Sequence, residues 1–141
     1  MDYYHQKFHD LQEEFQEVME KYPLFQEDID KINNYDIKEI DELLKREGDY
    51  YFKRALDKLE DLIKDIKDKS THITKVYKEY EELVEEWQKI DGYEIDESSL
   101  LDINKKVEQS GDLINRPSIK DIDKAIVLIN EAIKELKEYV K

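Results

Sequence analysis

Two histidines near the start of the chain have the type and spacing closest to a chemical motif. His5 and His9 are four residues apart, so a helix would place both on one face, and Glu13 extends that row by one turn. Two imidazoles one turn apart can chelate zinc. The stretch lacks the general-base glutamate of the catalytic His-Glu-x-x-His motif, however. We therefore interpret both histidines as surface residues and keep the set as a minor metal-site candidate.

No other catalytic motif is present in the sequence. The chain has no cysteine, no Glu-x-x-His pair for a two-metal carboxylate site, no glycine-rich phosphate loop and no Gly-x-Ser-x-Gly nucleophile elbow. Its many carboxylates fall opposite the apolar stripes, where water would solvate them, whereas acid–base catalysis needs a desolvated cleft. The sequence therefore predicts a protein that is not an enzyme and needs no cofactor. The alternative is a metal-binding helical-bundle enzyme.

Charge limits the partners that the chain is expected to bind. It contains 37 acidic and 23 basic residues, which gives a net charge of -14. Proteins bind nucleic acids and anionic membranes largely through Lys and Arg, and no basic patch is readable here, so we expect neither partner. The charge supports one further alternative, an acidic regulator that mimics nucleic acid for a basic protein. No apolar run could span a bilayer and no signal sequence is readable, which favours a cytoplasmic location.

Composition and periodicity predict the fold class. Three glycines and two prolines are too few for a sheet protein, and Lys, Glu and Leu are abundant, so we expect an all-α protein. We predict an elongated antiparallel helical bundle with one very long central helix and short connecting helices at its ends, forming a single domain over residues 1–141. The predicted helices cover residues 2–22, 24–34, 36–48, 49–91, 98–111 and 117–141.

Polar and turn-forming residues set the expected helix ends. Asn33-Asn34 predicts the exit from the second helix. Asp36 and Glu39 fit a capping box at the start of the third helix. The other expected signals are a stop at Gly48, caps at Asp49, at Ser98 or Ser99 and at Ser118, and an end or kink at Gly111.

The segment 49–91 carries the strongest helical signal. Its apolar stripe runs from Phe52 to Trp87 at alternating spacings of four and three, and Ser70 is the only polar member. We favour one helix of about forty residues, roughly 60 Å long. Two helices joined near Ser70 remain the alternative, because uninterrupted helices of this length are unusual.

Aromatic and isoleucine residues on these stripes are candidates for protein contacts. Tyr77, Tyr80 and Trp87 share one face of the long helix, where they are either core residues or interface anchors. Ile126 and Ile133 lie on an isoleucine-rich seam of the last helix, which could pair with a second copy and form a homodimer. A second group lies off the main stripes and would mark a contact patch if exposed together: Tyr3, Tyr50, Tyr51 and Tyr93.

Residues 36–59 and 122–140 have an acidic, Lys/Glu-rich helical texture. Both stretches are similar to helices in the C-terminal lid region of Hsp70-type chaperones and their bacterial relatives. The resemblance implies a helical domain that covers or contacts clients or co-chaperones. The nucleotide-binding domain of those proteins is missing from this sequence, and the chain ends in Tyr139-Val140-Lys141, not in the acidic tetrapeptide of the eukaryotic cytosolic members.

Charge, periodicity and resemblance together predict a non-enzymatic protein–protein interaction or scaffolding domain. Its acidic helix faces would select basic partners, and helix-face docking would be the mechanism. The sequence does not name the partner. It also leaves open whether these residues are a whole protein or a domain excised from a longer one.

Overall fold

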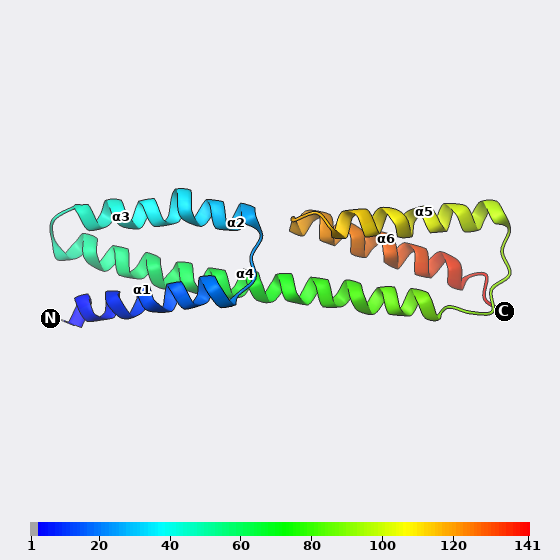
Figure 1. The fold of residues 1–141 in the computed structure, drawn as a ribbon, viewed down its shortest axis with the longest axis horizontal. Helices are drawn as coiled ribbons and strands as arrows, with labels where there is room; N and C mark the ends of the chain where they lie inside the picture. Colours follow the sequence, from blue (N-terminus) through cyan, green and yellow to red (C-terminus); the bar gives the residue numbers. More distant parts are fainter. Residues whose placement is uncertain (1–2) are drawn as a thin grey trace. The chain divides into compact units, whose positions relative to one another are not determined.

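The computed structural model describes residues 3–141, which form an all-α fold, as the sequence predicted (Figure 1). The described chain divides into two compact units, of which the first ends at Ile73 and the second covers Thr74–Lys141. The helices are α1 (Tyr3–Lys21), α2 (Gln26–Lys31), the π-helical turn η1 (Ile32–Asp36), α3 (Ile37–Lys45), α4 (Asp49–Lys89), α5 (Glu97–Ile114) and α6 (Ile119–Lys137). No helix in this part of the chain is long and apolar enough to cross a membrane.

The prediction of a single long helix is confirmed. Helix α4 contains 41 residues and contributes its first part to one unit and its last part to the other. The alternative with a break near Ser70 is wrong, because that residue lies inside the helix and is only 1% exposed. The apolar stripe stays in phase across Ser70, and no glycine or proline interrupts the backbone hydrogen bonds.

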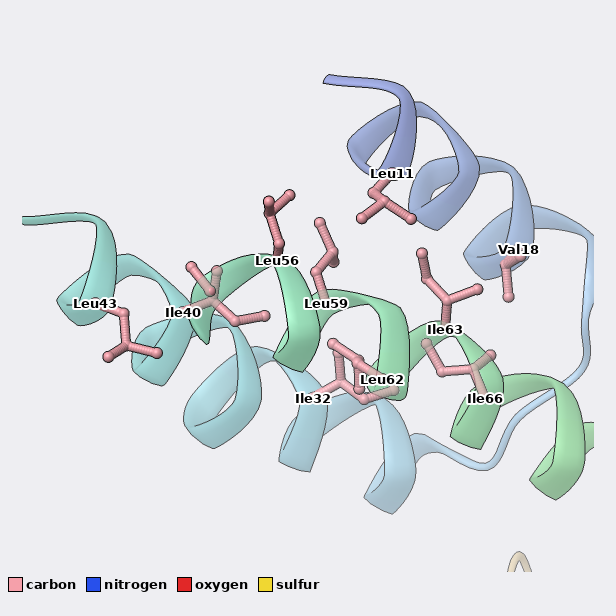
Figure 2. Close-up of a cluster of buried hydrophobic side chains, with 11 residues drawn as sticks. Leu11, Val18, Ile32, Ile40, Leu43, Leu56, Leu59, Leu62, Ile63 and Ile66 are labelled. Carbon is pink, nitrogen blue, oxygen red and sulfur yellow. The ribbon is translucent and has the colours of Figure 1, made fainter. Parts of the chain in front are cut away.

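Hydrophobic side chains from three directions fill the core of the first unit (Figure 2). Helix α1 supplies Leu11 and Val18, and the α2–η1–α3 segment supplies Ile32, Ile40 and Leu43. Burying each Leu or Ile side chain contributes about 1.5–3 kcal/mol to stability. The buried residues of α4 in this cluster are Ala55, Leu56, Leu59, Leu62, Ile63 and Ile66. Ala55 and Leu62 lie beside the predicted stripe, because α4 packs against two neighbours and needs a wider apolar face.

Ion pairs show how the helices of the first unit run. Lys7 and Glu14 of α1 pair with Glu60 and Lys67 of α4 in the same order, so these two helices are parallel. Lys58 and Lys69 of α4 pair with Glu39 and Asp28 in reversed order, which makes the α2–η1–α3 segment the antiparallel neighbour. Since α1 and α4 are parallel, the chain between them must run in the opposite direction to bring α4 back to the end where α1 begins. The short helices form this antiparallel segment and do not fill the end of a bundle, where the sequence had predicted them.

The exit predicted at Asn33-Asn34 is wrong, because the helix continues through both residues as a π-helical turn. The Ile37 N–H donates to the Ile32 carbonyl, five residues earlier. This wider turn suits the apolar spacing, since Ile32 and Ile37 are five residues apart and both pack against the same core. The capping box is also wrong, because Asp36 has helical dihedral angles and its side chain makes no capping hydrogen bond.

Gly48 marks the turn between α3 and α4, as predicted. Helix α3 ends at Lys45, and Gly48 has a φ of 109°, which favours glycine. Its carbonyl accepts a hydrogen bond from the Phe52 N–H at 3.4 Å, so Gly48 holds the capping position and Asp49 is the first helical residue. The expected cap at Asp49 is thus displaced by one position.

Helices α5 and α6 pack together with the end of α4 in the second unit. Ile103, Ala132 and Leu136 form a buried cluster against which Trp87 and Val107 pack. Ala125 and Ala132 are fully buried, and their small side chains permit close approach of the neighbouring helices. The other buried residues of α6 are Ile122, Ile126, Ile129, Ile133 and Leu136.

The start of α5 differs from the predicted cap. Asp96, not Ser98 or Ser99, is the capping residue, and its carboxylate accepts the Ser99 N–H at 3.0 Å. The Ser99 hydroxyl and N–H and the Ser98 hydroxyl donate to that carboxylate and hold its pKa below the ordinary value of 3.8. Gly111 does not end α5, which continues to Ile114.

The last residues of the chain leave the predicted helix. Ser118 holds the capping position of α6 with extended backbone angles, but its side chain makes no capping hydrogen bond. Helix α6 ends at Lys137, and Val140 forms an isolated antiparallel bridge with Tyr93. The Lys141 N–H donates to the Gly92 carbonyl at 3.1 Å. The expected helical heptad to the end of the chain is therefore wrong after Lys137.

Candidate functional site

The three metal-ligand candidates do not form a site. The His5 ring stacks on Phe52, with the ring centroids 4.6 Å apart. Nε2 of His9 lies 3.2 Å from Oε1 of Glu13, and both side chains are more than half exposed. Within residues 3–141, no group of three or more His, Asp or Glu side chains is arranged to hold a metal ion.

The five predicted interaction residues lie in the second unit, where two are buried and three are partly buried. Ile126 and Ile133 are buried within the single chain, at 9% and 5% exposure, so the seam proposed for a homodimer is already covered. Trp87 packs against the buried cluster of α5 and α6. Tyr77 is half-buried on the same helix.

Tyr80 takes part in a polar contact inside the second unit. Its hydroxyl lies 3.1 Å from the Ser110 hydroxyl, which itself donates to the Val107 carbonyl at 2.7 Å. Since the single hydroxyl proton of Ser110 is used in that bond, Tyr80 donates to Ser110. Ser110 is fully buried, and this arrangement satisfies its oxygen. The structure thus places Tyr80 in a packing role.

Four tyrosines instead gather at one end of the first unit, where α1 and α4 both begin. Tyr3 and Tyr4 meet edge to face with ring centroids 5.4 Å apart, and Tyr50 and Tyr51 do so at 5.2 Å. The two pairs belong to one surface because Lys53 of α4 reaches the Tyr4 ring of α1. Tyr3 and Tyr50 are 72% and 63% exposed.

Three cations lie over these rings. The Arg46 guanidinium carbon is 5.2 Å from the Tyr51 centroid, and Nζ of Lys53 is 4.9 Å from the Tyr4 centroid. The guanidinium carbon of Arg54 is 5.9 Å from the Tyr50 centroid, and its Nη1 donates to the Tyr50 hydroxyl at 3.5 Å. We call this surface the aromatic–cationic patch: Tyr3, Tyr4, Arg46, Tyr50, Tyr51, Lys53 and Arg54.

The three cations of the aromatic–cationic patch lie against tyrosine rings and not against carboxylates. Within residues 3–141, none of them forms an ion pair with a carboxylate. In the same part of the chain, the lysines that do pair with carboxylates are Lys7, Lys58, Lys67, Lys69, Lys106, Lys137 and Lys141. The patch also holds two of the three arginines of the protein. Cation–π contacts occur about once per 70–80 residues, so three at one end of one unit are concentrated.

An apolar groove continues the patch along the first unit. Phe52 contacts Phe8 with ring centroids 5.6 Å apart, and Phe8 lines a groove between α1 and α3. Leu59 of α4 belongs to its lining, and Gln12 and Asp41 are among its polar residues. The groove holds no nucleophile or histidine, so its chemistry is that of a contact surface.

Sequence reasoning found the aromatic–cationic patch in part. Tyr3, Tyr50 and Tyr51 were candidates, whereas Tyr93 lies in the second unit at the bridge to Val140. The contact of Arg54 with Tyr50 has a local signal, because residues four apart are neighbours on a helix. The contact of Lys53 with Tyr4 joins two helices and has no signal in a single sequence. No protein-family model, curated protein or solved structure matches this chain.

Proposed function

We propose that this chain is a non-enzymatic protein-interaction domain that binds its partner through the aromatic–cationic patch. The observation that carries the proposal is the exposure of Tyr3 and Tyr50 on a surface where Arg46 lies over the Tyr51 ring and Arg54 over the Tyr50 ring. Tyrosine and arginine are enriched among the residues that dominate the energy of protein interfaces. In contrast, the isoleucine-rich face of α6 is buried within the chain.

The fold supports this role by holding the patch rigidly. Phe52 follows the Tyr50–Tyr51 pair and is fixed between His5 and Phe8 of α1. The cation–π contacts favour one orientation of the Tyr4, Tyr50 and Tyr51 rings in the free protein. A surface that is ordered in advance loses less conformational entropy on binding and gains affinity for that reason.

A chaperone-like version of the proposal follows from the resemblance to Hsp70-type lid helices. In that version the partners are unfolded or nascent chains, not one dedicated protein. The number and nature of the bound proteins distinguish the two versions.

Comparative affinity capture with matched tyrosine variants tests the proposal. Tyr50 and Tyr35 are both exposed tyrosines of the first unit, at 63% and 71%, but only Tyr50 belongs to the patch. We expect the Tyr50→Ala protein to lose stoichiometric partners that the wild-type and Tyr35→Ala proteins retain. Quantitative mass spectrometry of proteins bound from a lysate of the source cell measures this difference.

The controls decide what each outcome means. Thermal unfolding must show that both variants are as stable as the wild type, which is expected because both rings are exposed. A broad set of unfolded proteins that depends on Tyr50 would favour the chaperone-like version. Equal capture by the two variants, or no capture above background, would refute the proposal.

A further inference from the structure

We infer that the aromatic–cationic patch recognises an acidic segment of a protein partner. The inference rests on the proposed function and adds the chemistry of the partner. Its first support is the state of Arg46, Lys53 and Arg54, which lie on tyrosine rings and form no ion pair with a carboxylate of residues 3–141. In a protein with 37 acidic residues, three neighbouring cations without such a pair are available to carboxylates from outside.

The shape of the arginine side chain allows Arg46 and Arg54 to bind a carboxylate while they contact the tyrosine rings. A guanidinium has five N–H donors, so the ring contacts of Arg46 and Arg54 and the hydrogen bond from Arg54 to the Tyr50 hydroxyl leave further N–H groups for a ligand. Those N–H groups can bind a carboxylate in bidentate fashion, and such charge-assisted bonds are about twice as strong as neutral ones. The rings of Tyr50 and Tyr51 thus position Arg54 and Arg46 for an acidic ligand without neutralising their charge.

The local charge favours an acidic ligand at this end of the first unit. The stretch from Leu44 to Arg54 contains four basic and two acidic residues, whereas the whole chain has a net charge of -14. The net negative charge of the whole chain repels an acidic segment at long range, whereas the local excess of positive charge attracts it to the patch. At physiological ionic strength the repulsion is screened beyond about 8 Å, which leaves the contacts at the patch to decide affinity.

A short acidic protein segment fits better than a nucleic acid. A single-stranded nucleic acid would extend past the patch onto acidic helix faces, where no basic groove continues to follow its phosphates. A peptide of a few residues can place one or two carboxylates on the arginines and an apolar side chain against the tyrosines. We therefore commit to an acidic peptide and treat binding of an oligonucleotide as an opposing outcome.

Fluorescence anisotropy with matched probes tests the inference. The probes are three labelled five-residue peptides of one design, carrying Glu, Gln or Lys at the same two positions on either side of one central Leu, and a twelve-nucleotide single-stranded DNA. We expect the Glu peptide to bind at least tenfold more tightly than the Gln peptide and the DNA. Arg46→Gln and Arg54→Gln should each weaken binding of the Glu peptide about tenfold, because each removes a charge-assisted bond.

Arg116 provides the matched control for these variants. It is the third arginine of the protein, it is exposed in the second unit, and Arg116→Gln changes the net charge by the same amount. We expect this variant to bind the Glu peptide as the wild type does. Equal loss in all three variants, no preference for Glu over Gln, or DNA binding as tight as peptide binding would overturn the inference.

The two experiments separate failure of the inference from failure of the proposed function. If capture depends on Tyr50 while the Glu peptide does not bind, the patch is an interface for another kind of partner, and only the inference fails. If capture does not depend on Tyr50 while the Glu peptide binds through Arg46 and Arg54, the proposed interaction with cellular proteins fails.

Discussion

At the residue scale, the clearest electrostatic feature is the Asp96 carboxylate at the start of α5. Hydrogen bonds from the Ser99 hydroxyl, the Ser99 N–H and the Ser98 hydroxyl lower its pKa in the folded protein. A carboxyl with a lowered folded-state pKa stabilises the fold at pH values above its ordinary pKa of 3.8. That contribution disappears as the pH falls through the lower folded-state pKa, because both states are then protonated.

Replacing Asp96 by asparagine isolates this titration. Asn caps helices about as well as Asp but carries no charge. We expect the wild-type protein to be modestly more stable than Asp96→Asn near neutral pH, and the difference to vanish as the pH falls below 3.8. Thermal unfolding of both proteins at a series of pH values measures the difference, in which the titration of the other carboxylates cancels. A difference that is independent of pH would contradict this assignment.

At the element scale, helix periodicity predicted the long elements correctly and the local signals predicted the ends less well. The apolar stripes of α1, α4 and α6 can be read directly from the sequence, because a helix that buries one face repeats apolar residues at spacings of three and four. The π-helical turn η1, the cap at Asp96 and the bridge of Val140 depend on contacts with other parts of the chain. Asn33-Asn34 resembles a turn locally, but the core requires the helix to continue.

The extra residue in η1 leads to a prediction about chain length. Deleting Asn34 would reduce the Ile32–Ile37 spacing from five residues to four, which an ordinary α-helix accommodates on one face. We expect this deletion variant to keep its helix content and to unfold at a urea concentration equal to or higher than that of the wild type. Far-UV circular dichroism and urea unfolding measure both properties.

Insertion of one alanine after Asn34 is the matched control. It lengthens the same spacing to six residues and turns Ile37, Ile40 and Leu43 away from the core. Since each of these side chains contributes about 1.5–3 kcal/mol when buried, we expect a loss of several kcal/mol. If the deletion were as damaging as the insertion, the π-helical turn would be a required element and not an accommodated extra residue.

At the scale of the whole molecule, opposite effects of charge compete. The net charge of -14 makes the folded chain repel itself, because folding brings the carboxylates closer together. Ion pairs such as Lys58–Glu39 and Lys137–Glu86 oppose this repulsion. Each involves exposed or half-exposed groups and contributes only about 0–1 kcal/mol. The summed repulsion of the excess acidic residues acts over longer distances than any of these pairs.

We therefore expect added salt to stabilise the folded protein. Raising the ionic strength from 0.01 M to 0.15 M shortens the screening length from about 30 Å to about 8 Å, which removes long-range repulsion and leaves contacts of 3–4 Å less affected. We expect the midpoint of thermal unfolding to rise by several degrees over this range of NaCl concentrations. Tetramethylammonium chloride should produce the same rise, because screening needs no bound cation.

The direction of this response decides which charge effect governs the stability of the fold. If the unfolding midpoint falls as salt is added, the attraction in the lysine–carboxylate pairs along α4 outweighs the repulsion among the excess acidic residues. A rise with NaCl alone would mean that sodium ions bind specific carboxylates. A rise with both salts would place the acidic surface among the features that cost stability, because screening alone would then relieve its repulsion.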